Sequence, residues 1–256
     1  MIKFKTITKK SKRLALSGKG GCGKSYAITN LYKSPLIFDL EQKWTTEAPF
    51  NKFQVVDFGD KPSYNIIMQS LIGILNEADL KKYDALVIDT VSEVETLCVN
   101  HSIIEDYKGK KSNYSSYSSG DNHELPQYFS EFLRVLQDIQ AKHDIDVCLI
   151  CHARKTMEQN VMGDDYSKVV LDLKKHPMAK MLKWVDYLGC IYDDVDVEND
   201  GLKMKIKDSK RMISFDNSSP YFDAKSARSG DLLTVPFDIK GEWVNKIFKK
   251  PEVKNG

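Results

Sequence analysis

The sequence predicts an α/β fold, with a mostly parallel central sheet flanked by helices and an antiparallel β extension at the C-terminal end. Three observations lead to this prediction. Short apolar runs alternate with stretches of helical periodicity through most of the 256 residues. A glycine-rich turn joins the first apolar run to the first helix, and two later apolar runs end in acidic residues. Beyond about residue 195, two strand-like stretches replace this alternation.

The expected strands and helices follow one another along the chain. Strands are indicated by apolar runs that are continuous rather than alternating, as in strands buried on both faces of a parallel sheet. They cover residues 13–17, 36–39, 53–57, 85–89, 147–151 and 187–192. Helices are indicated by apolar residues three and four positions apart. They cover residues 24–32, 63–77, 129–142, 178–184 and 243–248.

Turn and proline signals, together with the length of the chain, give the remaining element boundaries and the domain organisation. The first helix must stop before Ser34-Pro35, because the residue before a proline disfavours helical dihedral angles. Residues 204–207 and 211–215 are expected to form antiparallel strands after a turn at residues 199–201. We expect a single domain over residues 1–256, with its core at about 12–195 and a C-terminal hairpin and Lys/Arg-rich tail at about 196–256.

Charge and hydropathy limit the possible partners. Lys and Arg number 38 against 36 acidic residues, so the net charge of +2 neither requires nor excludes a nucleic-acid partner. Any basic surface must therefore be local. The N-terminus lacks the apolar segment of a signal peptide, and no apolar stretch approaches the ~18 residues of a membrane span. We expect a cytoplasmic protein that does not contact a membrane.

The cysteines are odd in number and indicate reduced, buried thiols. They are Cys22, Cys98, Cys148, Cys151 and Cys190, and at least three lie in apolar strand-like runs. Cys148 and Cys151 have the CxxC spacing of metal and redox sites. Because they lie inside the expected strand 147–151 without a second pair nearby, the strand interpretation is favoured.

An eight-residue glycine-rich turn directly follows the first expected strand and indicates a polyphosphate ligand. It consists of Gly18, Lys19, Gly20, Gly21, Cys22, Gly23, Lys24 and Ser25. This is the G-x-x-x-x-G-K-[ST] phosphate loop, whose glycines let backbone N–H groups approach the phosphates. Lys24 supplies a positive charge for the β- and γ-phosphates, and Ser25 supplies a hydroxyl for Mg²⁺. ATP and Mg²⁺ are therefore the expected cofactors.

Polar residues at three other strand ends complete the expected site. Asp89 ends the strand 85–89 at the carboxyl edge, where ligands sit in α/β sheets, and is expected to orient Mg²⁺ through water. Glu41, just past the strand 36–39, is expected to orient or activate the attacking water, while Asp39 organises the strand end. His152 follows the strand 147–151, where it can hydrogen-bond the γ-phosphate and report its loss to the next segment. Lys24, Glu41 and His152 form the expected catalytic set.

These motifs together resemble those of the RecA family. Residues 38–41 (FDLE) resemble its Ile-Asp-Ala-Glu, and residues 87–91 (VIDTV) resemble its Val-Val-Asp-Ser-Val. Residues 150–154 (ICHAR) stand where that family has Ile-Asn-Gln-Ile-Arg, its γ-phosphate sensor. The resemblance implies a RecA-like P-loop ATPase with Glu41 as the catalytic carboxylate and His152 as the sensor.

The chain resembles more closely the small phage RecA-like ATPases that act as single-strand annealing proteins (the Sak-type branch), an AAA-type group of phage nucleotide-binding proteins. Shared features are the short first helix, the Leu-Glu strand tip, the sensor His and a Lys/Arg-rich Ala-Lys segment, here residues 224–230. The resemblance implies single-stranded DNA binding with annealing or strand exchange, assembly into a ring or filament, a single-strand-binding protein as partner, and a phage-infected bacterial cytoplasm. Lys225 and Arg228 then contact either a neighbouring subunit's phosphates or DNA.

Two long polar segments fall where RecA has its DNA-binding loops. Residues 107–127 and 154–176 are expected not to form well-ordered elements, and loops of this length are commonly functional. They combine lysines, which neutralise phosphates, with tyrosines, which stack on bases. The expected DNA contacts are Lys108, Lys110, Lys111, Tyr114, Tyr117, Arg154 and Lys155.

Two alternatives remain open at this level. Residues 19–25 also fit the deviant phosphate loop of ParA and MinD ATPases, Lys-Gly-Gly-x-Gly-Lys-[ST], in which Lys19 would cross a dimer interface. The short first helix, His152 and the terminal Ala-Lys segment are not expected in that family. The other alternative is a nucleotide-binding adaptor without useful hydrolysis.

Overall fold

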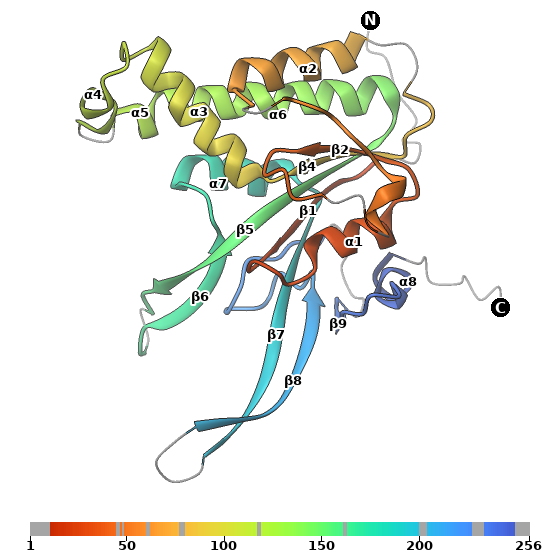
Figure 1. Cartoon of the computed structure of the whole chain (residues 1–256). Coiled ribbons are helices and arrows are strands. Elements are labelled where there is room, and N and C mark those ends of the chain that lie inside the picture. Colours follow the sequence, from red (N-terminus) through yellow and green to blue (C-terminus); the bar gives the residue numbers. More distant parts are fainter. Residues whose placement is uncertain are drawn as a thin grey trace, which may run out of the picture.

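The chain is described by a computed structural model, which covers residues 11–44, 47, 49–59, 62–76, 80–116, 119–160, 163–199, 204–226 and 233–248. Within these residues, nine strands form one sheet with helices on both faces (Figure 1). The strands are β1 (Arg13–Gly18), β2 (Pro35–Asp39), β3 (Gln54–Val55), β4 (Ala85–Asp89), β5 (Asp146–Glu158), β6 (Tyr166–Leu171), β7 (Tyr187–Asn199), β8 (Met204–Ser214) and β9 (Thr234–Pro236). The helices are α1 (Lys24–Leu31), α2 (Tyr64–Asn76), α3 (Val91–Glu105), α4 (Lys111–Ser115), α5 (Ser119–Asn122), α6 (Glu124–His143), α7 (Lys175–Trp184) and α8 (Glu242–Phe248), with a 3₁₀ turn, η1, at Phe50–Lys52.

The sheet is parallel through its centre and antiparallel along one side. Its order is β3-β2-β4-β5-β1-β7-β8-β9, and each neighbouring pair from β3 to β7 runs parallel. β8 and β9 continue the sheet in antiparallel pairing, and β6 pairs with β5 outside this order. The predicted α/β fold, with a mostly parallel sheet and an antiparallel C-terminal extension, is confirmed.

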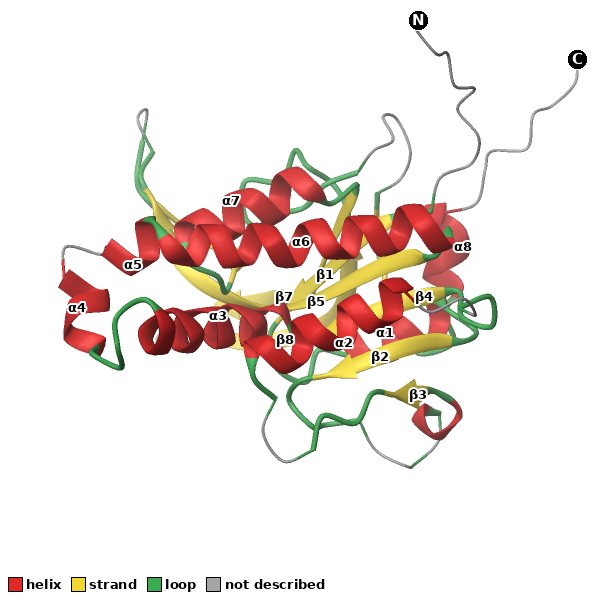
Figure 2. Ribbon diagram, turned by 90° about the horizontal axis from the view of Figure 1, so that it is seen from above, coloured by secondary structure: helices red, strands yellow, loops and turns green. Residues whose placement is uncertain are grey.

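The buried strands separate two hydrophobic layers, because successive side chains of a strand point to opposite faces. Leu86 and Ile88 of β4 belong to the core cluster that includes α2, α3, α6 and α7. Ala85 and Val87 belong to the other cluster, with α1 and α8. Figure 2 shows α2, α3 and α6 lying over the sheet on the first of these faces. Among the described helices, none combines the length and apolar character needed to cross a membrane.

Helix α3 was not predicted by periodicity, because its apolar residues are not gathered on one side. It directly follows β4. The Thr90 hydroxyl caps it by accepting a hydrogen bond from the backbone N–H of Glu93 at 3.3 Å. Thr90 and Glu93 have the T-x-x-E spacing of a capping box, so a signal for this helix was present in the sequence.

The segment 107–127 is folded where the structure describes it, which corrects the expectation of a loop without ordered elements. It contains α4, α5 and the start of α6, which begins at Glu124 rather than near residue 129. Tyr114 is only 4% exposed, and its hydroxyl donates a hydrogen bond to Asp121 at 2.7 Å. Its ring is therefore not free to stack on a base. Tyr117 lies outside the described residues.

The segment 154–176 is also more regular than expected. β5 continues to Glu158 and pairs with β6, so residues 154–158 and 166–171 form the two strands of a β-hairpin. The two predicted strands near residues 204–207 and 211–215 form one continuous strand, β8, which pairs with β7. Part of the predicted turn at residues 199–201 lies outside the described residues. Both hairpins extend away from the helical layers (Figure 1).

The cysteines follow the predicted pattern. All five are buried with free thiols. Cys148 and Cys151 lie within β5, which confirms that their CxxC spacing belongs to a buried strand.

The C-terminal extension packs directly beneath the phosphate loop. Trp243 of α8 is fully buried, and its ring lies 5.8 Å from that of Phe237. Phe237 in turn lies close enough to Gly23 to contact the loop. The extension thus supports the segment that holds the phosphates.

We predict that Trp243→Ala lowers the free energy of unfolding by about 3–5 kcal/mol, because it removes a large buried ring and leaves a cavity. Urea unfolding followed by circular dichroism measures this. Ile239→Ala, at a side chain that is 67% exposed in the same segment, is the matched control and should change the value by less than about 0.5 kcal/mol. Equal losses for the two variants would contradict the supporting role of the extension.

Candidate nucleotide-binding site

The phosphate loop connects β1 to α1 and depends on glycine. Gly23, at the start of α1, has a φ of 100°, a left-handed conformation that side chains disfavour. A Cβ atom there would also lie 2.8 Å from the Phe237 ring. Lys24 is buried, and its Nζ donates hydrogen bonds to the carbonyl oxygens of Gly18 and Lys19 at 3.0 and 2.9 Å. These bonds hold the ammonium group beside the loop.

Parallel pairing brings four strand ends to the mouth of the loop. Asp39 of β2 is the register partner of Asp89 of β4, and Gly18 of β1 is that of His152 of β5. The resulting cleft has a volume of about 300 Å³. It is lined by Gly20, Gly21, Gly23, Lys24, Ser25, Tyr26, Glu41, Lys43, Phe50, Asp89 and His152. The structure thus joins the predicted loop, carboxylates and histidine in one site.

Glu41 is held by hydrogen bonds from three sides. Its Oε1 accepts from His152 Nε2 at 2.7 Å and from Thr90 Oγ1 at 3.0 Å, and its Oε2 pairs with Lys43. Partial burial opposes ionisation, but the bonds from Lys43, His152 and Thr90 outweigh it and lower the pKa of Glu41 to about 2. Glu41 is therefore ionised at neutral pH, and it is linked to Thr90 at the start of α3 and to His152 of β5.

Asp39 and Asp89 form a second acidic group at the adjacent strand ends. Asp89 Oδ2 accepts a hydrogen bond from Trp44 Nε1 at 2.8 Å, and Asp39 Oδ2 accepts one from the Trp44 backbone N–H at 2.8 Å. Burial raises the pKa of Asp89 to about 6, although the Trp44 bond opposes this rise, and the charges of Asp39 and Glu41 add to it. A cation at this position would favour the ionised form.

The donor set fits Mg²⁺, which prefers oxygen ligands. Asp39 Oδ1 is buried and has no hydrogen-bond partner within the described residues. Its register partner Asp89 lines the cleft together with Ser25. The described part of the chain contains no cluster of three or more His, Cys, Asp or Glu side chains suited to a metal. Ser25 and Asp89 would therefore hold the ion together with phosphate oxygens. Bound there, Mg²⁺ would neutralise phosphate charge.

Lys19 bonds within its own chain. Its Nζ pairs with Asp193 of β7, which also accepts a hydrogen bond from Arg211 Nε of β8 at 3.0 Å. The bonds from Lys19 and Arg211 lower the pKa of Asp193. This ion pair connects the phosphate loop to the β7–β8 hairpin. In a deviant phosphate loop the same lysine would instead point toward a partner subunit.

Comparisons with known proteins agree with this geometry. A protein-family model described as an AAA domain matches residues 10–227. The chain belongs to this AAA domain family. With its phosphate loop, the family membership makes it a nucleotide-binding P-loop ATPase. A search of curated proteins finds no match.

Solved structures similar to this AAA domain include a RadB recombinase. The RadB match has 13% identity and a TM-score of 0.49, and covers 91% of this chain and 90% of that one. A KaiC-like protein from the archaeon Pyrococcus horikoshii OT3 matches with 11% identity and a TM-score of 0.45, over 91% of this chain and 88% of that one.

The predicted DNA contacts of the AAA domain lie outside the cleft. Lys108, Lys110 and Lys111 are exposed at the turn between α3 and α4 and the start of α4. Arg154 and Lys155 are exposed on β5 within the hairpin, where Arg154 Nε lies 3.5 Å from an Asp172 carboxylate oxygen. They remain predicted contacts.

Of the two C-terminal cations with an expected contact role, the structure describes Lys225 but not Arg228. Lys225 Nζ donates to the carbonyl oxygens of Leu182 and Val185 at 2.9 and 2.6 Å, which satisfies the C-terminal end of α7. Within this chain Lys225 is therefore a helix cap. Arg228 lies outside the described residues.

Sequence reasoning missed several residues of the AAA site. Lys43 and Trp44 bond the two acidic groups, Thr90 bonds Glu41, and Tyr26 and Phe50 line the cleft. Lys43 and Trp44 directly follow the strand tip that contains Glu41, so their position beside the cleft was a usable signal. Phe50 gave no such signal, because it reaches the cleft through the turn η1.

The raised pKa of Asp89 leads to a pH-dependent prediction. Its ordinary value is 3.8 and its folded value is about 6, so the folded state binds more protons between them and stability falls as pH rises. Relative to Asp89→Asn, the wild-type free energy of unfolding should fall by about 2 kcal/mol from about pH 4 to about pH 7. Urea unfolding in EDTA measures both proteins, and parallel pH curves would contradict the raised pKa.

Proposed function

We propose that this AAA domain binds and hydrolyses ATP with Mg²⁺ and uses the nucleotide to control its binding of single-stranded DNA, thereby promoting annealing or strand exchange. The observation that carries the proposal is the hydrogen bond between Glu41 and His152. It joins the expected catalytic carboxylate to the strand that continues into the β5–β6 hairpin.

The positions of the charged residues in the cleft indicate their chemical roles. Lys24 and the N-terminal end of α1 face the phosphates with positive charge. Glu41 has a pKa far below neutral, which makes it a weak proton acceptor. Its role is therefore to orient the attacking water by accepting a hydrogen bond, rather than to remove a proton early in the reaction.

The nucleotide signal has a physical route through His152. The backbone N–H of His152 donates to Ser92 Oγ at 3.3 Å, and its carbonyl oxygen accepts from the Asp172 N–H at 2.8 Å. The next residue, Ala153, is the first register partner of the hairpin, opposite Leu171. A γ-phosphate that drew His152 away from Glu41 would shift this junction, and with it Arg154 and Lys155.

The two segments proposed to bind DNA are connected to each other. Lys174, just before α7, donates through Nζ to both carboxylate oxygens of Asp121 in α5, at 2.8 and 2.7 Å. Glu95 of α3 accepts from the Lys174 backbone N–H at 2.7 Å. A shift of the hairpin segment therefore acts on the helices beside Lys108, Lys110 and Lys111.

The remaining parts of the proposal rest on the family resemblance of the motifs. We place the protein in the cytoplasm of a phage-infected bacterium, as a homo-oligomeric ring or filament that works beside a single-strand-binding protein. Lys225 then acts within its own subunit, and Arg228 contacts either DNA or a neighbouring subunit.

We predict ATP turnover that single-stranded DNA increases and that Lys24→Ala abolishes. Glu41→Gln should lower turnover at least about 100-fold while leaving ATP binding within a few-fold, because with His152 and Thr90 donating to the amide oxygen its NH₂ group replaces the carboxylate oxygen that accepts from water, and the phosphate contacts are kept. Phosphate release with and without a dT oligonucleotide measures turnover, and a fluorescent ATP analogue measures binding. Equal turnover in wild-type and Glu41→Gln proteins would instead favour a nucleotide-binding adaptor.

A second prediction concerns the lysines beside α4. Replacing Lys108, Lys110 and Lys111 with Gln should reduce the slope of log K against log salt for single-stranded DNA by about 2, because three phosphate contacts are lost at about 0.7 each. Anisotropy titrations over a salt series measure the slope. A control with Gln at three other exposed lysines, Lys33, Lys240 and Lys246, loses the same charge. Equal slopes for the two triple variants would remove these lysines from the DNA site.

A further inference from the structure

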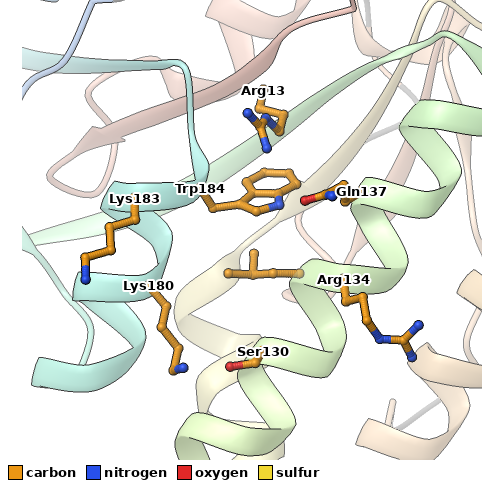
Figure 3. Close-up of a pocket in the computed structure, with 8 residues that line it drawn as sticks. Arg13, Ser130, Arg134, Gln137, Lys180, Lys183 and Trp184 are labelled. Atoms are coloured by element: carbon orange, nitrogen blue, oxygen red, sulfur yellow. The ribbon is translucent and has the colours of Figure 1, made fainter. Parts of the chain in front are cut away.

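A second hollow lies between α6 and α7, apart from the nucleotide cleft. Its volume is about 440 Å³, and it shares no lining residue with that cleft. Leu133 of α6 and Trp184 of α7 contribute its apolar surface. Figure 3 shows Lys180 and Lys183 on the adjoining turns of α7, and Arg13 approaching Trp184 from β1.

The charge around the hollow is unusual for a helical surface. α7 contains Lys175, Lys180 and Lys183 and no acidic residue. Lys180 and Lys183 are three residues apart and therefore neighbours on the helix surface. Within the described residues, no carboxylate pairs with either of them. Lys183 suits the negative end of the helix dipole, but Lys180 lies further from that end, so the dipole does not explain the pair.

The two arginines at the hollow differ from the lysines because they are already paired. Arg13 bonds Asp186 at 2.9 Å, and Arg134 lies 3.3 Å from Asp138. The planar arginine fork is the group best suited to a carboxylate. The charges left free are lysine ammonium groups, which bind phosphate as point charges. Phosphate therefore matches the free charges, and the aromatic ring of Trp184 beside them, a group on which bases stack, favours a nucleic acid over an acidic peptide.

Trp184 adds an aromatic group beside these cations. The Arg13 guanidinium lies 5.3 Å from the centre of its ring. The indole N–H is buried without an acceptor in the described part of the chain. Buried donors are rarely left unpaired, so a ligand oxygen at the hollow would relieve this one.

We propose that this hollow binds single-stranded nucleic acid, with Lys180 and Lys183 contacting neighbouring phosphates and a base packing against Leu133 and the edge of Trp184. Cations beside an aromatic ring are the usual combination for single strands. The inference rests on the proposed function, because it assumes that the chain binds such strands. It adds a contact surface distinct from the two segments that flank the nucleotide cleft.

The test uses the full chain and fluorescein-labelled dT30 in anisotropy titrations at several salt concentrations. Lys180→Gln with Lys183→Gln should reduce the salt slope by about 1.4 and weaken binding about 25-fold at about 0.1 M salt, taking the electrostatic contribution to vanish near 1 M. Replacing both lysines with Arg should restore binding. Gln at the exposed residues Lys240 and Lys246 is the matched control and should leave the slope within error.

A second measurement does not depend on any substitution. Oligothymidylate containing 5-iodouracil, irradiated in the complex and mapped by mass spectrometry, should cross-link to Trp184.

Thermal unfolding midpoints equal to that of the wild type would show that the lysine variants are folded.

The outcomes separate this inference from the proposed function. If wild-type protein binds dT30 and the Lys180/Lys183 variant binds it equally well, the hollow is not the site and the proposed function survives. If wild-type protein fails to bind dT30 with or without ATP, both proposals fail. Lysine-dependent binding of a labelled decaglutamate, with dT30 binding unaffected by the same variant, would assign the hollow to an acidic peptide and overturn the inference.

Discussion

The structure depends on the way a parallel sheet gathers charge at one edge. Because the carboxyl ends of β2 and β4 lie side by side, Asp39, Asp89 and Glu41 meet in a partly buried space. Burying several ionised carboxylates together costs free energy unless each negative charge is balanced by hydrogen bonds or by a positive charge. Trp44 and Lys43 bond this acidic group from the segment after β2, and His152 bonds it from β5. The negative charge that these bonds only partly offset makes the edge suited to Mg²⁺, while Lys24 and the N-terminal end of α1 supply the positive charge that suits a polyphosphate.

The sequence predicted those parts of the site that are formed by residues consecutive in the chain. The phosphate loop, the strands and the strand-end residues Asp89 and His152 were recognisable from local pattern alone. Contacts between positions far apart in the sequence were not recognisable. Trp44 bonds Asp89, which is 45 residues away, and Lys19 pairs with Asp193 on another strand. Their partners are set by strand order, which depends on tertiary packing and not on local spacing.

The two polar segments show a different limit of sequence reasoning. Their Ser-rich and Lys-rich composition indicated loops, yet Tyr114 is buried and β5 runs on into a hairpin. The Tyr114 ring helps to hold α4 against α5, because it packs on Gly120 and its hydroxyl bonds Asp121. Cations on such preformed elements lose less conformational entropy on binding a strand than cations on a flexible loop. Folding of these segments therefore changes how they would bind DNA rather than removing the possibility.

The three bonds to Glu41 differ in how readily they break, and for the proposed function this difference implies an order of events in the cleft. Lys43 is 70% exposed, so water screens its ion pair with Glu41; the pair helps to keep Glu41 ionised but contributes little to folding stability. Thr90 and His152 bond the other carboxylate oxygen from positions fixed by β4 and β5. Under the proposed function, an arriving phosphate would compete first for Lys43, and this would free Glu41 Oε2 to accept a hydrogen bond from water. The bond to His152 would then remain as the link that a γ-phosphate has to disturb to act on the hairpin.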